Sequence, residues 1–292
     1  MTTYYVKGAT GNNANSGVDW ANAVQTVAGA LAKATPTIIY CDASETFTAT
    51  AAITWTMPSG GTIAVISVTS GTTTWAAGAK EAIGSANNAF TITPNSAGSA
   101  LFVYGMTIEG ATGFQSSGTI NIGGTGIGNF TFESCSFLAP STHWNSVYQF
   151  GAGSSRGSRL TFNNCTMQVK NVSSDDFIRV GGAEILFTNL TVTTQASKPP
   201  YFFRGTVFAT ASEGGSVTIR DSDLSGWSHA SSYYYELTNS TVKITFINCK
   251  LHSNVTATSG TWSKSIGSFT IINCDSGDTI NTFEYFFGRR DF

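Results

Sequence analysis

Short stretches of this chain alternate apolar and polar residues with a period of two, as β-strands do when one face is buried. In residues 244–251 (ITFINCKL), Ile244 and Phe246 share one face, but the apolar residues that follow Asn248 are out of phase with them. The alternation therefore slips by one position at Asn248. A residue in the left-handed backbone region would explain the slip, because it bends the strand and returns the later side chains to the same side.

The same shape recurs along the chain at intervals of 25 to 32 residues. In each copy, two apolar residues two positions apart precede the slip, and inward-facing residue types follow it. Most residues at the slip are glycine, asparagine or aspartate, which tolerate the left-handed region. The predicted corners are Gly105, Ser134, Asn164, Asn189, Asp221, Asn248 and Asn273, with a weaker earlier copy at Ser67.

A strand-based repeat of this length predicts a solenoid. About ten residues before most copies, another apolar pair is followed by small residues, as in 120–124, 148–153 and 178–182. This gives about three strands per coil. The predicted fold is all-β, a single-stranded right-handed parallel β-helix over residues 37–280, because parallel crossovers are overwhelmingly right-handed.

Two segments are candidates for closing the ends of the coil, where backbone groups would otherwise be unpaired. Residues 1–36 are expected to form a strand and a capping helix over 19–34, with Asp19 as N-cap and one apolar face from Trp20 to Leu31. The aromatic C-terminal tail, 281–292, is expected to act as a cap or to contact a partner. Its candidate contact residues are Phe283, Tyr285, Phe286, Phe287, Arg289, Arg290 and Phe292.

The charge and hydropathy of the chain argue against binding nucleic acid, spanning a membrane and carrying a secretory signal. Only 11% of the residues are charged and the net charge is −2, which gives no electrostatic basis for binding nucleic acid. No run of 18 apolar residues occurs, so no membrane span is predicted. The N-terminus lacks the basic and apolar regions of a secretory signal.

Four cysteines occupy the position directly after a corner, and Cys41 lies outside this scheme. Residues stacked in neighbouring coils have parallel Cβ directions, which suit a disulfide poorly. The cysteines also lack the spacing of a zinc site. We therefore expect buried free thiols, no metal and no cofactor. The corner asparagines are expected to hydrogen-bond along the coil axis, as stacked amides do. The four cysteines are Cys135, Cys165, Cys249 and Cys274.

A glycan-cleaving site on such a fold would need paired carboxylates. The weak catalytic candidates are Asp175, Asp176 and Asp223. The sequence lacks the Gly-His and Arg-x-Lys motifs that pectate lyases and polygalacturonases combine with their acids. No catalytic residue is therefore assigned, and the chain is expected not to be an enzyme. The other acids considered are Glu213, Asp221, Asp275 and Asp278, and the histidines His143, His229 and His252 have no evident partner.

Aromatic residues in the connecting segments suggest either a subunit interface or a strip that stacks on sugars. Interface is the preferred interpretation, because tryptophan and tyrosine are enriched there. The residues concerned are Trp144, Trp227, Trp262 and Tyr233 to Tyr235.

Two stretches resemble known proteins. The opening, YYVKGATGNNANSG followed by WANAVQTVAGALA, resembles the N-terminal cap of pectate-lyase-like parallel β-helix proteins. The stretch 37–58, taken with the NNCT, INCK and INCDSGDT repeats, is similar to tailed-phage virion proteins of the β-helix type. The resemblance covers residues 1 to about 285. It implies the β-helix fold and a structural role in a virus particle.

The resemblance leads to a functional expectation. The coils begin near residue 3 and run to about 276, which favours a compact module over a tailspike with separate anchoring and receptor-binding domains. We expect a capsid-decorating (cement) protein, made in the host cytoplasm and located in the virion. It would bind the major capsid protein or another virion protein, as a homotrimer. The alternative is a tail-associated spike or fibre that binds or depolymerises host surface polysaccharide.

Overall fold

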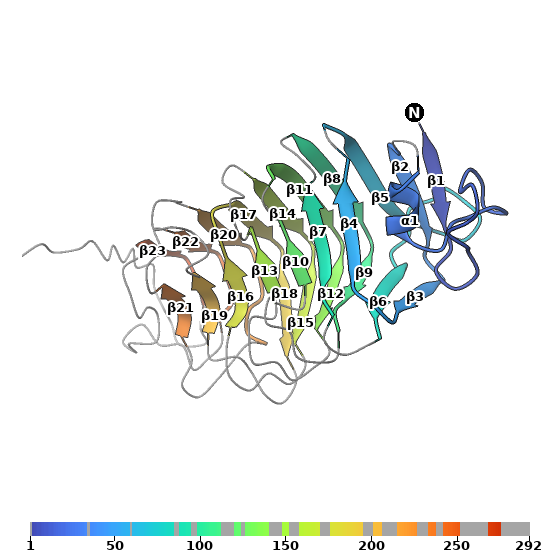
Figure 1. The fold of residues 1–292 in the computed structure, drawn as a ribbon. Helices are drawn as coiled ribbons and strands as arrows, with labels where there is room; N and C mark the ends of the chain where they lie inside the picture. Colours follow the sequence, from blue (N-terminus) through green and yellow to red (C-terminus); the bar gives the residue numbers. More distant parts are fainter. Residues whose placement is uncertain are drawn as a thin grey trace, which may run out of the picture.

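The chain winds into a rod of parallel strands around one apolar core (Figure 1). Its parallel pairing, with about three strands per coil, confirms the right-handed parallel β-helix predicted from the sequence. The computed structural model describes residues 2–33, 36–58, 60–84, 88–94, 98–111, 120–123, 126–139, 148–151, 158–169, 176–194, 201–205, 215–226, 233–237, 242–251 and 268–275.

Three parallel sheets form the walls of the rod. Sheet A contains, in spatial order, β1 (Thr3–Val6), β2 (Ile38–Asp42), β5 (Thr62–Val68), β8 (Ser99–Tyr104), β11 (Gly128–Glu133), β14 (Arg159–Asn163), β17 (Glu184–Thr188), β20 (Ser216–Arg220), β22 (Lys243–Ile247) and β23 (Ser268–Ile272). Sheet B contains β3 (Thr46–Ala49), β6 (Lys80–Ile83), β9 (Thr107–Glu109), β12 (Ser136–Ala139), β15 (Thr166–Val169) and β18 (Thr191–Thr194). Sheet C contains β4 (Ile53–Met57), β7 (Phe90–Pro94), β10 (Ile120–Ile122), β13 (Tyr148–Phe150), β16 (Asp176–Val180), β19 (Tyr201–Gly205) and β21 (Tyr233–Leu237).

Equivalent inward side chains stack from coil to coil along the core. Phe132, Phe162 and Phe187 are register partners in successive strands of sheet A, and none of them is exposed. Their rings are nearly parallel, with centroids 5.1 Å and 4.8 Å apart. Such stacking makes the core one continuous column, so burial of apolar area stabilises every coil through its neighbours.

Sheet A is joined to sheet B by the corners predicted from the sequence. Gly105 has φ of 68°, and the six other corners have φ between 49° and 58°. The six corners from Gly105 to Asn248 also link two coils: the amide of Asn164, for example, donates to the carbonyl oxygen of Thr188 at 2.9 Å, and that of Asn248 to Ile272 at 2.9 Å. The bend therefore leaves the corner amide paired with the next coil.

The weaker copy at Ser67 does not form such a corner, and that prediction is wrong. Strand β5 continues through Ser67 to Val68, and the chain then leaves the coil in a loop before β6. This loop explains why the next corner is a glycine. A Cβ atom on Gly105 would lie 2.9 Å from the Cα of Ala77, closer than real contacts allow.

The capping helix is much shorter than predicted. Helix α1 (Val27–Leu31) begins after Thr26, whose hydroxyl accepts a hydrogen bond from the amide of Gly29, so Asp19 is not the N-cap. The earlier part of the predicted helix forms bends and a turn and then a bridge at Val24, which pairs with β1 by exchanging hydrogen bonds with Tyr5 and Lys7. We call α1 the N-terminal lid, because it packs against β1, β2 and β4 at the first coils.

The strand of the predicted N-terminal segment, β1, belongs to the coil itself, since it pairs in parallel with β2. The predicted C-terminal tail, 281–292, lies outside the described residues.

The corner geometry predicts the effect of two substitutions at Asn248. Valine is branched at Cβ and should be strained at φ of 52°, whereas glycine is not. Both substitutions remove the Asn248 side-chain hydrogen bonds. We expect Asn248→Val to lower the free energy of unfolding by about 1–3 kcal/mol more than Asn248→Gly, measured by urea denaturation. Equal stability of the two variants would contradict a left-handed corner.

Candidate functional site

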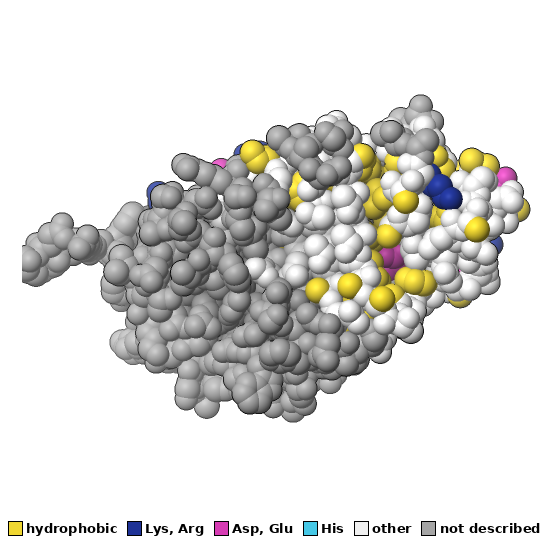
Figure 2. Space-filling view, viewed as in Figure 1, with side chains coloured by type: hydrophobic (Ala, Val, Ile, Leu, Met, Phe, Trp, Pro, Cys, Tyr) yellow, Lys and Arg dark blue, Asp and Glu magenta, His cyan; other side chains and the backbone are white. Residues whose placement is uncertain are grey.

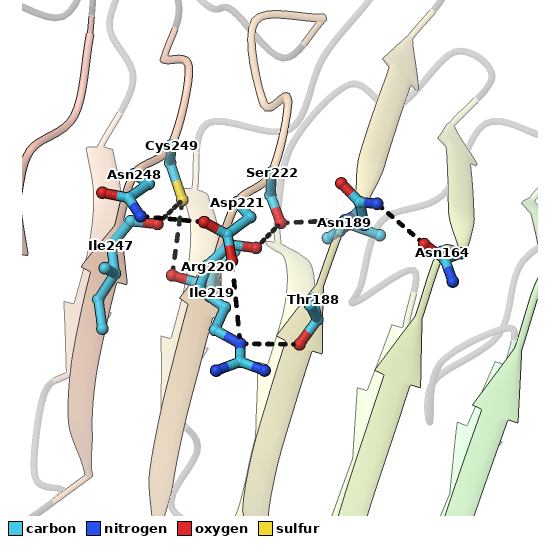
Figure 3. A network of polar contacts seen from close by, with 11 residues as sticks. Asn164, Thr188, Asn189, Ile219, Arg220, Asp221, Ser222, Ile247, Asn248 and Cys249 are labelled. Carbon is cyan, nitrogen blue, oxygen red and sulfur yellow. Dashed lines mark hydrogen bonds and ion pairs between the residues drawn. The ribbon is translucent and has the colours of Figure 1, made fainter.

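The corner side chains form a polar ladder on the outside of the rod (Figure 3). The amide nitrogen of Asn189 donates to Oδ1 of Asn164 at 2.9 Å. In the last coils, Asn273 donates to Asn248 at 2.9 Å, and Asn248 donates to Oδ1 of Asp221 at 3.0 Å. These groups bond mainly to one another, as stacked amides do. The ladder therefore has a structural explanation.

Arg220 lies beside the ladder at Asp221 (Figure 3). Its Nε donates to the hydroxyl of Thr188 at 3.2 Å and lies 4.0 Å from Oδ2 of Asp221. Both side chains of this ion pair are about half exposed. The half-exposed arginine side chain is thus bonded to the preceding coil.

The position after each corner holds small groups that bond to the bend. The thiol of Cys165 donates to the carbonyl oxygen of Asn163 at 3.3 Å, and the hydroxyl of Ser222 donates to Arg220 at 2.7 Å. The same hydroxyl accepts the amide of Leu190 from the preceding coil at 3.0 Å. Cysteine and serine therefore recur here because they satisfy backbone groups exposed by the bend.

All five cysteines are buried and free, as predicted. Burial raises the pKa of the Cys41 thiol well above its usual value, and the nearby carboxylates of Glu81 and Asp42 add to this shift. For Cys165, a hydrogen bond with Cys135 and burial raise the pKa. Because the thiolate is the reactive form, the thiols of Cys41 and Cys165 should be inert in the folded protein.

Asp223 is the one weak catalytic candidate whose side chain is described. Its Oδ1 accepts the amide of Ser225 at 3.0 Å and also the hydroxyl of that residue, while Lys250 lies 3.4 Å from Oδ2. Partial burial tends to raise the pKa of Asp223, but these partners outweigh it and lower the pKa below the ordinary value. A carboxylate held ionised in this way is poorly suited to act as a general acid.

The other acids are not brought together with Asp223 by any described contact. Asp176 begins β16, where only its backbone position is described, and Asp175 lies outside the described residues. Among the described residues, no group of three or more histidine, cysteine, aspartate or glutamate side chains could hold a metal ion. Glu213, Asp278 and the histidines His143, His229 and His252 also lie outside the described residues.

An aromatic cluster covers the outside of sheet A at its N-terminal end. Tyr5, Tyr40, Ile66 and Tyr104 are register partners in β1, β2, β5 and β8. The rings of Tyr5 and Tyr40 lie 5.8 Å apart, and Ile66 between Tyr40 and Tyr104 is only 4% exposed. We call this surface the aromatic face, which comprises Tyr5, Trp20, Tyr40, Trp75, Phe102 and Tyr104.

Two tryptophans extend the aromatic face from outside the sheet. Trp20 lies 4.8 Å from Tyr5, and Trp75 lies 4.7 Å from Tyr104, between ring centroids. Trp75 comes from the loop after β5, which folds back so that Trp75 forms an antiparallel bridge with Val68. Although it packs on two rings, Trp75 is still 50% exposed.

The aromatic face bears no charge. Apart from Asp42 and Val68, which end β2 and β5 and are buried, the outward positions of β1, β2, β5 and β8 are occupied by threonine, alanine, isoleucine, phenylalanine and tyrosine. Beyond β8, the first charged residue at an outward position of sheet A is Glu133, the register partner of Tyr104 in β11. Figure 2, which views the molecule as in Figure 1, shows mostly uncharged groups, with a few charged side chains, on the described part of the face that it displays.

The aromatic residues singled out from the sequence are different ones, and the structure does not describe their side chains. Trp144, Trp227 and Trp262 lie outside the described residues, as do all seven predicted contact residues of the tail. Tyr233 to Tyr235 belong to β21, of which only the backbone is described. Sequence reasoning missed the aromatic face, although alternate tyrosine and phenylalanine in residues 101–104 and the YY pair at the start were available signals.

Thiol labelling tests the burial of the cysteines. We expect the native protein to leave all five thiols unreacted with a water-soluble disulfide reagent, and the denatured protein to react at five sites. Rapid modification of any cysteine before unfolding would contradict the packing of the position after the corner.

Asp223 should contribute little to stability, and only above a certain pH. Its folded-state pKa lies below 3.8, so its contribution is present above pH 3.8 and is lost as the pH falls through the folded value. We expect Asp223→Ala to cost no more than about 1 kcal/mol at pH 7, because the group is partly exposed and screened. Thermal melting at pH 7 and pH 2.5 checks this. A larger loss at the lower pH would be the contrary result.

Comparisons with known proteins add no relative. No family model matches the chain, and neither the curated proteins nor the solved structures contain a match. Among the described residues, no helix has the length and apolar character needed to cross a membrane. A functional proposal for this chain therefore depends on its own fold and surfaces.

Proposed function

We propose that this chain is a structural protein of a phage particle, which decorates the capsid by burying part of its surface against a shell protein. The observation that carries the proposal is the uncharged aromatic face on a rigid wall of parallel strands. Tryptophan and tyrosine are the residues that contribute most to protein interfaces, and charged residues are depleted at interface centres.

The rest of the described surface is consistent with a structural role. Charged side chains engage each other between coils, as Arg159 does with Glu184 at 2.9 Å and Lys80 with Glu109. The acid that was a catalytic candidate, Asp223, is bonded to Ser225 and Lys250. These contacts strengthen the rod and leave the aromatic face as the best candidate for recognition.

Trp75 is the residue of this face best placed to contact the shell. It is half exposed, and its ring already rests on Tyr104 and Phe102, so little side-chain freedom would be lost on binding. A homotrimer would gain in a second way, because its three linked copies bind one shell together and each contact need not be strong.

A tail-associated spike or fibre that binds or depolymerises surface polysaccharide is the second candidate. The same rings favour it, because aromatic side chains beside threonine hydroxyls could stack on sugars while the hydroxyls bond to them. The two functions differ in where the protein lies on the particle and in whether it releases a product from glycans. A depolymerase would release new reducing ends or unsaturated sugars from capsular or lipopolysaccharide glycans, and a decorating protein would not.

Binding to isolated shells tests the proposal. We expect the purified chain to bind tail-less heads stripped of it, and Trp75→Ala to weaken binding at least about 30-fold, as loss of a central tryptophan costs about 2 kcal/mol. Ile127→Ala is the control, because Ile127 is 42% exposed but lies outside the aromatic face. Antibody labelling of whole particles should mark the head.

Labelling confined to the tail tip would contradict the decorating role. Release of sugar fragments by the purified chain would instead favour the spike.

A further inference from the structure

A glutamate occupies a position inside the coil that other turns fill with apolar residues. Glu81 of β6 is the register partner of Phe47 in β3 and of Ile108 in β9, and the next residue in the row is Phe137. Glu81 is only 2% exposed. An ionisable group at such a position needs a reason, because burying it costs free energy unless it is well bonded.

The carboxylate of Glu81 joins the N-terminal lid to the coil. Its Oε1 accepts the amide of Val27, the first residue of α1, at 2.6 Å. Its Oε2 accepts Nε1 of Trp55 at 2.9 Å, and Trp55 is fully buried in β4 against Phe90. One side chain of β6 thus connects sheet B both to the lid and to a strand of sheet C.

The charges around Glu81 do not neutralise it. Lys80, its neighbour in β6, pairs with Glu109 of β9. The lid, β3 and β4 bring no charged side chain, since their sequences are VAGAL, TFTA and ITWTM. The titratable groups that line the same small recess as Glu81 are Cys41, Asp42, Glu45 and Lys80, with Lys7 near Asp42.

The two acids in that recess are already bonded elsewhere. Asp42 accepts hydrogen bonds from Ser44 and Ser70, and Glu45 accepts the amides of Ala9 and Thr10. Glu81 thus shares the recess with further negative charge rather than with a free cation.

Both protonation states of Glu81 have a cost in the closed structure. The ionised form keeps two N–H hydrogen bonds but is a buried negative charge. The protonated form carries no charge, but its hydroxyl competes with one of the two donors. Burial is the larger effect and raises the pKa of Glu81 to about 7, against the opposing influence of the hydrogen bonds from Val27 and Trp55.

We propose that Glu81 makes the N-terminal lid responsive to pH: the protonated side chain holds α1 closed on the coil, and ionisation favours an open lid in which the carboxylate reaches water. The inference is independent of the proposed function, because it concerns only contacts inside the rod.

The direction follows from linkage. With the lid open, Glu81 should have its ordinary pKa of 4.5, and with the lid closed a value of about 7. A group whose pKa is raised in the closed state contributes stability that is fully present below pH 4.5 and is lost as the pH rises through 7. The lid should therefore be tighter at pH 5 than at pH 8.

Hydrogen exchange of the lid amides tests this. The amides of Ala30 and Ala32 bond to carbonyl oxygens inside the helical segment, at 3.0 Å and 3.1 Å, and exchange when it opens. After correction for intrinsic exchange, we expect opening to increase from pH 5 to pH 8 on the order of ten- to a hundredfold, from the two pKa values and linkage. The amides of β14 and β17, in remote coils, should not show this increase in opening.

Variants separate Glu81 from other titrating groups. Glu81→Gln keeps the size and an acceptor but cannot ionise, so the pH dependence of lid exchange should disappear. Glu184→Gln, at an exposed ion pair in a remote coil, should retain it. Trp55→Phe removes a donor that favours the ionised form, so the midpoint of the transition should move to higher pH.

Three results would overturn the proposal. They are equal lid protection at pH 5 and pH 8 in the wild type, a lid that is looser at pH 5, and a pH dependence that persists in Glu81→Gln. If Glu81→Gln does not fold, the wild-type comparison and the direction of the Trp55→Phe shift still decide the question.

Discussion

A single backbone bend, repeated after every strand of sheet A from β8 onward, determines this structure. An L-amino acid with positive φ is unfavourable unless its side chain is small or can bond locally, and here the bend occurs at glycine, serine, asparagine and aspartate. The bend directs the side chains on both sides of it to the interior. Without it, Cys249 and Leu251 would face solvent instead of the core in which both are buried. The three-walled coil, its stacked phenylalanines and its outer amide ladder all follow from this geometry.

The bend also explains the chemistry beside it. It leaves backbone amides and carbonyls that the sheets do not pair, and the side chain of the residue after the corner bonds to them. Cys165 and Ser222 do so from inside the coil, and Asn164 and Asn189 bond to each other outside it. Groups that resemble a site, such as thiol pairs and a row of polar residues, are thus accounted for by the coil itself. The features not explained in this way are the aromatic face and Glu81.

Much of the fold could be predicted from the sequence because it depends on local patterns. Period-two alternation and the residue types at the corners located Asn164, Asn248 and their equivalents and the inward cysteines without tertiary information. The predicted helix over 19–34 was wrong because Val24 pairs with β1, a contact that no helical periodicity reveals. The prediction of a corner at Ser67 was wrong for a similar reason, since the loop after this residue is held by tertiary contacts.

The candidate site was less predictable. Trp75 reaches Tyr104 only because a loop folds back over sheet A, and nothing in the local sequence specifies that path. Glu81 appears in the sequence as an ordinary charged residue beside Lys80, and its inward direction depends on the register with Phe47 and Ile108. Asp223 was singled out from the sequence as a weak catalytic candidate, but its carboxylate is bonded to Ser225 and Lys250. Local patterns therefore predict the coil, while surfaces and buried charges depend on how the coils are assembled.

The most direct test of the account is a measurement of backbone torsion angles in solution at the six non-glycine corners. NMR amide–Hα couplings and the strong intraresidue amide–Hα contact that accompanies positive φ report on each corner separately. The account predicts φ near 49° to 58° at all six, together with contacts between the corner amide and the following coil at the five corners from Ser134 to Asn248. Negative φ at these residues, with the strands continuing straight through them, would contradict it.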